Sequence, residues 1–243
     1  ATNVFPHVDN IGLFTDGVTQ LLDDDGVFII EASYLLDLID QTLFDTIYHE
    51  HLCYLSLTPM VPFFERHGLE IFAAEKEPIG ASGPAIRVFA QKKGGPRQIE
   101  PSLPQMLVTE KQWGVGDLAT YRRYSAQVEK VRTDLLELIG QVLASGSKVG
   151  AYGAPAKGNT LLNYVGLTTR EIGCVAENSK IKQGLLTPGS HIPIVSDEEF
   201  LSRMPEYALL LTWNYLDFFL KNSDYIKQGG KFIVPIPSPR IVP

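Results

Sequence analysis

The pattern of apolar and polar positions in the first part of the chain predicts helices set between short strands. Residues 3–8 have the pattern of a strand end followed by a loop. In residues 11–22 apolar side chains recur every three or four positions, which indicates an amphipathic helix. A second, short helix is expected at residues 35–39. A third is expected at residues 58–66, with Thr58 as its N-cap.

Three segments in the same part have the composition of strands. Val27 to Ile30 is a continuous apolar run, as expected of a buried parallel strand, and Glu31 follows just past its carboxyl end, where α/β proteins place functional groups. Residues 69–75 and 85–91 predict two further strands. The segment between them, residues 78–84, is rich in Gly and Pro and is expected to be a loop.

The second part of the chain repeats a β–α rhythm after one long helix. Apolar residues with a period of 3.6 predict that helix at about residues 118–143. Four strands alternating with helices indicate a parallel sheet covered on both faces; they are expected at residues 149–152, 172–175, 207–211 and 231–234. The charged, Pro-containing segment at residues 92–104 is the expected domain boundary.

Composition narrows the classes of function. The chain has 243 residues, 44% of them apolar and 20% charged, as in a soluble globular protein. A net charge of −7 without a basic cluster argues against nucleic-acid binding, and no apolar run reaches the ~20 residues of a membrane span. The cysteines, Cys53 and Cys174, are far apart, which fits a reducing cytoplasm and predicts no metal site in this chain.

The densest group of titratable side chains is the run Tyr48, His49, Glu50 and His51. A core does not select such a run, because each buried polar group needs a partner. An imidazole can exchange a proton near neutral pH, and a neighbouring carboxylate can orient it. The run therefore predicts proton transfer; the alternative is a surface loop with solvated histidines.

A glycine-containing turn joins the strand at residues 149–152 to the next helix. Gly153 and Lys157 would place helix amides and an ammonium group where a phosphate can bind, and Asn159 and Thr160 could add donors. The turn lacks the spacing of a dinucleotide fingerprint or a complete P-loop, so a plain tight turn is the alternative. Trp213-Asn214, after a strand, either packs in the core or lines the cleft.

These segments together resemble the sugar C-methyltransferases, which act on TDP-linked keto-deoxysugars and use S-adenosylmethionine. The resemblance covers nearly the whole chain, and its Phe-Asp-x-Ile-Tyr-x-Glu-His core is its most specific part. The motifs are Asn3-Val4 with His7, Gly26–Glu31, Phe44–His51, Tyr152–Gly158, Pro188–Pro193 and Trp213-Asn214.

The resemblance implies an α/β fold in three parts. Residues 1–95 would be the second half of a class I methyltransferase Rossmann-like sheet, ending in an antiparallel hairpin. Residues 96–146 would be a linker and a long helix, and residues 147–243 a Rossmann-like domain that binds the nucleotide sugar. The chain has no initial Met and opens like a strand end, so we expect it to be the C-terminal portion of a longer protein. Most of the S-adenosylmethionine site is then expected before Ala1, and zinc only in a separate N-terminal module.

The implied chemistry is removal of a proton next to a ketone, followed by methyl transfer to the carbanion. His51 is implied as the base, with Tyr48 and Glu50 beside it and His7 nearby at the preceding strand end. His7 or Tyr48 would donate a hydrogen bond to the enolate oxygen. Asn3 and His7 are implied as cofactor contacts, and the substrate contacts are Asn3, Glu31, Gly153, Lys157, Asn159 and Thr160.

Two segments depart from the family pattern, and two other functions stay open. Many relatives have His-Gly-Gly where this chain has Gly80-Ala81-Ser82-Gly83, and an Asp where it has Ala176-Glu177-Asn178. The alternatives are a non-catalytic nucleotide-sugar-binding module and an NAD-dependent oxidoreductase that uses the glycine turn and Glu177. The expected partner is a small nucleotide-sugar, with neither nucleic acid nor membrane.

Overall fold

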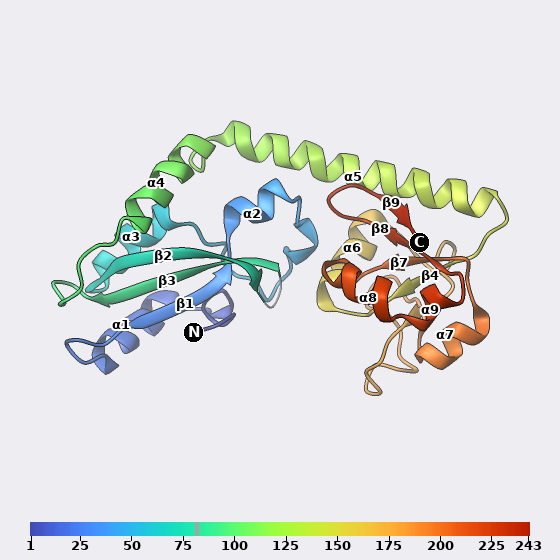
Figure 1. The fold of residues 1–243 in the computed structure, drawn as a ribbon, viewed down its shortest axis with the longest axis horizontal. Coiled ribbons are helices and arrows are strands. Elements are labelled where there is room, and N and C mark those ends of the chain that lie inside the picture. The colour runs from blue at the N-terminus through green and yellow to red at the C-terminus, as the bar shows by residue number, and fades with distance from the viewer. Residues whose placement is uncertain (81–82) are drawn as a thin grey trace. The chain divides into compact units, whose positions relative to one another are not determined.

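The computed structural model describes residues 1–80 and 83–243, which form two compact units. The first unit holds residues 1–40 and 49–124, and the second holds residues 41–48 and 125–243. Helix α5 (Leu118–Ala144) matches the long helix that the sequence predicts; it begins in the first unit and continues in the second (Figure 1). The packing therefore changes from one unit to the other inside α5, and not at residues 92–104. The assignment of three domains stays a prediction.

A three-stranded antiparallel sheet lies at the centre of the first unit. Its order is β1-β3-β2, and its strands are β1 (Phe28–Ser33), β2 (Leu69–Gly80) and β3 (Gly83–Lys92). Thr2 forms an isolated parallel bridge with Glu31, so the opening of the chain lies along β1. The predicted final hairpin is confirmed. The predicted loop at residues 78–84 is wrong, because strand pairing continues to Gly80 and Gly83; residues 81–82 lie outside the described part.

Short helices surround this sheet and bury its apolar side chains. They are η1 (Phe5–His7), α1 (Ile11–Leu21), α2 (Leu35–Asp40), α3 (Leu57–Arg66) and α4 (Ser102–Trp113). Phe5, Phe64 and Ile86 are among the least exposed residues of the resulting core. Helix α4 was not predicted, because its apolar residues do not gather on one face and it contains Pro104.

Glu110 of α4 caps helix α3, which corrects the prediction that Thr58 is the N-cap. Ser56 occupies the N-cap position without a side-chain hydrogen bond. The buried Glu110 carboxylate instead accepts from the backbone amides of Leu57 (2.6 Å) and Thr58 (2.7 Å), from Thr58 Oγ1 (2.5 Å) and from Tyr34 Oη (3.0 Å). Burial, and secondarily the Glu110 charge, raises the pKa of Tyr34. A distant carboxylate thus satisfies the first amides of α3.

The second unit contains a six-stranded sheet with the order β6-β5-β4-β7-β8-β9. All neighbouring strands are parallel except β8 and β9. The strands are β4 (Val149–Tyr152), β5 (Val175–Ala176), β6 (Ile194–Val195), β7 (Tyr207–Leu210), β8 (Lys231–Val234) and β9 (Arg240–Val242). The predicted Rossmann-like α/β class is confirmed. The strand expected at residues 172–175 is shorter and later, and β6 and β9 are too short to leave a periodic signal.

Helices and short 3-10 turns pack in the second unit beside this sheet. They are α6 (Ala156–Val165), α7 (Asp197–Arg203), η3 (Trp213–Tyr215), α8 (Leu216–Asn222) and α9 (Asp224–Lys227), with η2 (Phe44–Thr46) from the earlier part of the chain. Tyr152, Phe200, Tyr225 and Phe232 form an aromatic core with ring distances of 5.4–6.3 Å. Among the residues described, no helix combines the length and apolarity needed to cross a membrane.

The strand order creates one topological switch point in the second unit. The chain leaves β4 toward β5 and β6, then returns to β7 on the other side of β4. In open α/β sheets, ligands bind outside the carboxyl ends of the strands at such a point. Here the two loops approach closely: Gly153 has a φ of +82°, and a Cβ atom on it would lie 2.6 Å from the Thr212 side chain. Only glycine fits this position.

Candidate functional site

The first unit brings His7 and His51 together. His7 ends the short helix η1, whose Pro6 carbonyl accepts a hydrogen bond from the Leu52 amide at 2.9 Å. This backbone bond places the neighbouring His51 ring 4.8 Å from the His7 ring, measured between centroids. The Tyr54 ring lies edge-on to His51 at 6.4 Å, a neighbour that the sequence analysis did not identify. The predicted proximity of His7 to His51 is confirmed; the catalytic role of either residue stays a prediction.

The remaining members of the titratable run differ in their surroundings. Glu50 is exposed, in the turn directly before His51. Tyr48 is half-buried and belongs to the second unit, because the change of unit falls between Tyr48 and His49. The alternative of a solvated loop fits His49 and Glu50, which are both exposed. It does not fit His51, which is half-buried and packed against the rings of His7 and Tyr54.

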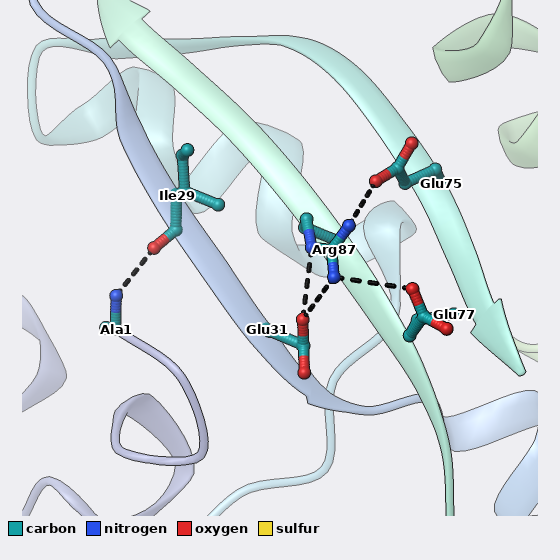
Figure 2. A network of polar contacts seen from close by, with 6 residues as sticks. All are labelled: Ala1, Ile29, Glu31, Glu75, Glu77 and Arg87. Carbon is teal, nitrogen blue, oxygen red and sulfur yellow. Dashed lines mark hydrogen bonds and ion pairs between the residues drawn. The ribbon is translucent and has the colours of Figure 1, made fainter. Parts of the chain in front are cut away.

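Glu31 lies within β1 and not past its carboxyl end, which corrects the prediction, and it belongs to an ion-pair network centred on Arg87. Figure 2 shows Arg87 between three carboxylates, and its Nε and Nη2 both donate to Glu31 Oε2, at 3.0 and 2.7 Å. Glu75 accepts at 2.7 Å and Glu77 at 3.3 Å. These hydrogen bonds raise the pKa of Arg87. The network arises because Glu31 and Glu75 face Arg87 across neighbouring strands. A ligand contact for Glu31 would compete with this network and stays a prediction.

Asn3 is held beside the same strand. Its backbone amide donates to the Glu31 carbonyl at 2.8 Å, and its φ of +53° is in the left-handed region that asparagine tolerates. The backbone of Asn3 is therefore fixed, while its proposed contacts with substrate and cofactor remain predictions.

The glycine turn of the second unit is held by a carboxylate of the chain itself. Glu177, just after β5, accepts from the backbone amides of Ala154 and Ser179, both at 2.9 Å. The Lys182 ammonium donates to the Ala154 carbonyl at 2.8 Å and lies 3.8 Å from Glu177. The turn is therefore stabilised by side chains of the chain itself, and the Ala154 amide is already hydrogen-bonded and not open to a phosphate. Asn159 and Thr160 are half-buried in the next helix, α6, and their proposed contacts with substrate stay predictions.

Lys157 lies in a cluster that the sequence did not predict. Its ammonium donates to Asn214 Oδ1 at 2.5 Å and lies 4.2 Å above the Trp213 ring. The Trp213 indole donates in turn to Asp45 Oδ2 at 2.7 Å. Trp213-Asn214 therefore lines the switch point. Asp45 could not be assigned from the sequence, because nothing near it in the chain indicates a partner so far away.

Within the part of the chain that the structure describes, the predicted site residues form no metal cluster. No three His, Cys, Asp or Glu side chains within 1–80 and 83–243 gather closely enough to hold a metal ion. A cavity of about 600 Å³ opens at the opposite end of the second sheet, where the strands β4, β5 and β7 begin. One of its cations, Arg203, is paired with Glu199. This cavity contains none of the predicted site residues.

The fold and the side chains together define a two-unit α/β protein. One unit carries an imidazole pair, and the other is a Rossmann-like domain. Residues 80–237 match the family described as the C-methyltransferase C-terminal domain, so the chain belongs to this family.

A curated relative covers most of the chain. The C-methyltransferase NovU of Streptomyces niveus is 39% identical over 239 residues, which is 98% of this chain and 56% of NovU. The chain thus spans little more than half the length of this relative.

Proposed function

We propose that this chain acts, as part of a longer protein, in S-adenosylmethionine-dependent methylation of a carbon next to the ketone of a nucleotide-linked sugar. The observation that carries the proposal is the His7–His51 pair, with rings 4.8 Å apart, in a member of the C-methyltransferase family. The similarity to NovU supports methyl transfer to carbon. The sugar nucleotide and the cofactor come from the family resemblance of the motifs.

In the proposed reaction, His51 removes the proton. The C–H bond next to the ketone breaks, the proton moves to an imidazole nitrogen of His51, and the electron pair is delocalised as an enolate. A hydrogen bond from the Tyr48 phenol or from His7 stabilises the enolate oxygen. Glu50 orients the His51 ring. When bound, S-adenosylmethionine supplies the electrophilic methyl group that the carbon takes up.

The residues of this chain fit only part of a cofactor site. Asn3 and His7, at the strand end beside β1, offer an amide and an imidazole that could hold one end of S-adenosylmethionine. In the described part of the first unit, no glycine turn connects a parallel strand to a helix. We therefore assign that turn to a preceding segment, as the greater length of NovU allows. Any zinc would belong to a further module outside this chain.

The alternative of an NAD-dependent oxidoreductase is weaker. The acid that would hold the ribose, Glu177, already accepts from the amides of Ala154 and Ser179. A ribose hydroxyl would have to displace these bonds. Calorimetry on this chain with TDP and with NAD separates the two functions: binding of NAD without TDP would favour the oxidoreductase.

The direct test is methyl transfer by the full-length protein to a panel of TDP-linked keto sugars, with His51→Ala and His51→Asn. Loss of a general base lowers kcat about 10²–10⁴-fold. His67→Ala is the matched control, because His67 is an imidazole of the same unit that pairs with Asp16 at 2.6 Å. Unchanged turnover in both His51 variants would exclude His51 as the base. No transfer by the wild-type protein would exclude the proposed function.

A further inference from the structure

The short segment 41–48 packs with the second unit, although the residues on both sides of it belong to the first. Its centre, η2, is almost fully buried: Phe44 is 5% exposed, Asp45 0% and Thr46 5%. The Phe44 ring lies 5.1 Å from the ring of Tyr164, in the last turn of α6. Amides of Phe44, Thr46 and Ile47 make hydrogen bonds within the segment. Such burial shows a docked segment and not a loose connection.

Asp45 is the polar centre of this docking. Its Oδ2 accepts from the Trp213 indole at 2.7 Å, and the face of the same indole carries the Lys157 ammonium at 4.2 Å. Lys157 is in turn fixed by Asn214 at 2.5 Å. One aromatic ring thus connects a buried carboxylate to a largely buried cation.

The cluster lies at the topological switch point of the sheet. Lys157 follows β4, and Trp213 with Asn214 follows β7, the two strands on either side of that point. Sheets of this order bind anionic ligands there, beyond the strands' carboxyl ends. In this protein a carboxylate of the chain itself, Asp45, takes that place.

The two charges depend on each other. Burial raises the pKa of Asp45, and the Lys157 charge and the Trp213 hydrogen bond oppose that rise. Burial lowers the pKa of Lys157, and the Asp45 charge opposes that fall. Removing one charge leaves the other buried without its counter-charge, so the charge pair and the Trp213 hydrogen bond hold the segment together.

We propose that Asp45 is a positioning residue, which docks at the switch point and fixes the segment that ends at Tyr48. Tyr48 lies three positions after Asp45, within the same unit. The effect on catalysis rests on the proposed function of Tyr48; the docking does not. The segment is then held by Lys157, Trp213 and Asn214. The sequence had suggested that Lys157 binds the sugar diphosphate; in this proposal it binds the segment instead.

The docking is tested on this chain by amide hydrogen exchange across residues 41–48. Asp45→Ala and Trp213→Phe each remove one side of the hydrogen bond, so exchange at these amides should accelerate at least about tenfold. Asp45→Asn keeps an acceptor for the indole but removes the counter-charge of Lys157, so its exchange should fall between that of the wild type and that of Asp45→Ala. Asp40→Ala is the matched control: Asp40 accepts from the Trp113 indole at 2.8 Å, but on the exposed surface of the first unit.

The catalytic consequence is tested with the same variants in the full-length protein. Because a small misplacement of a catalytic group can cost up to about 100-fold, Asp45→Ala should lower kcat about 10- to 100-fold with KM nearly unchanged. Asp45→Asn should restore part of kcat, because it keeps the acceptor but not the charge, and Asp40→Ala should not change kcat. A general loss of stability would not give this separation of kcat from KM.

Three results would overturn the proposal. Exchange at residues 41–48 could stay at the wild-type rate in Asp45→Ala. Exchange could accelerate while kcat stays unchanged. Lys157→Met could abolish TDP binding without accelerating exchange, which would return Lys157 to the substrate. If the wild-type protein transfers no methyl group, the proposed function fails, and the exchange experiment alone decides the docking.

Discussion

Two carboxylates, one in each unit, are completely buried, and they are held in different ways. Glu110 accepts four hydrogen bonds, including two from the first backbone amides of α3. Asp45 accepts one from the Trp213 indole, and its Oδ1 has no hydrogen bond of regular geometry to any described residue, although nearby backbone amides lower its pKa. Protein donors therefore replace water fully around Glu110 and only partly around Asp45.

The number of hydrogen bonds distinguishes the two carboxylates. Glu110 has the surroundings of a purely structural group, whereas Asp45 has those of a group that can position a functional segment. A fully bonded group is rigid and costly to disturb. Asp45, which is only partly hydrogen-bonded, also depends on the charge of Lys157. The docking of segment 41–48 can therefore be lost while the rest of the second unit stays folded.

Glu110→Ala should be the most damaging substitution. It leaves two helix amides and the Tyr34 hydroxyl buried without partners, which should lower the free energy of unfolding of the first unit by about 3–5 kcal/mol. Urea unfolding followed by Trp113 emission, in a Trp213→Phe background, reports this unit alone. Gln112→Ala, exposed on the same helix, is the control and should change stability by less than about 0.5 kcal/mol. Equal losses in both variants would contradict the capping role.

Asp45→Ala should have a smaller effect, on the second unit only. It removes one hydrogen bond to a charged acceptor and leaves Lys157 without its counter-charge, a loss of about 1–3 kcal/mol. Trp213 emission in a Trp113→Phe background measures the change. If Asp45→Ala costs as much as Glu110→Ala, the two carboxylates are equally structural and the contrast fails.

The stability of the second unit should carry a pH dependence that Asp45→Asn removes. Because burial raises the pKa of Asp45, the folded chain keeps this proton in a pH range where the unfolded chain has released it. The stabilisation is present below the ordinary aspartate pKa, about 3.9, and is lost as the pH rises through the higher folded value. Wild-type stability minus that of Asp45→Asn should therefore fall with rising pH in this window. A rising difference would contradict the assignment.

Arg87→Ala should have the smallest effect, although it removes contacts with three carboxylates. The network lies at a partly exposed sheet face, where solvent weakens ion pairs. Its small loss of thermal stability should shrink further in high salt, because salt screens surface charges. Lys92→Ala, which removes a single exposed pair with Asp24, is the comparison. A large effect that salt leaves unchanged would show that Arg87 is more than a surface partner.

Much of the fold could be predicted from local patterns. The strands β4, β7 and β8 were found because parallel strands read as short apolar runs. The apolar run before Glu31 was also found as a strand, β1, but the prediction of parallel pairing was wrong, because β1 pairs with β3 in antiparallel orientation. The α5 helix was found from its period. Strands as short as β5 and β6, with two residues each, are too short to show an alternating pattern of apolar and polar residues. Helix α4 is not amphipathic, so it lacks the helical pattern by which α5 was found.

The candidate site was predictable only where its residues are close in sequence or share a family motif. The Tyr48–His51 run was visible by itself, while the place of His7 beside His51 came from the resemblance. The docking of Asp45 on Trp213 and the cap from Glu110 are contacts between distant segments. Propensity and spacing do not encode such contacts, since they depend on the packed fold.

The most direct test of the account is solvent exchange of the proton next to the ketone. Proton NMR in D₂O would follow a TDP-linked keto sugar with the full-length protein and no S-adenosylmethionine, so that removal of the proton is measured alone. The account predicts exchange with the wild-type protein and with His67→Ala, and loss of exchange with His51→Ala. Exchange at the wild-type rate with His51→Ala would contradict it.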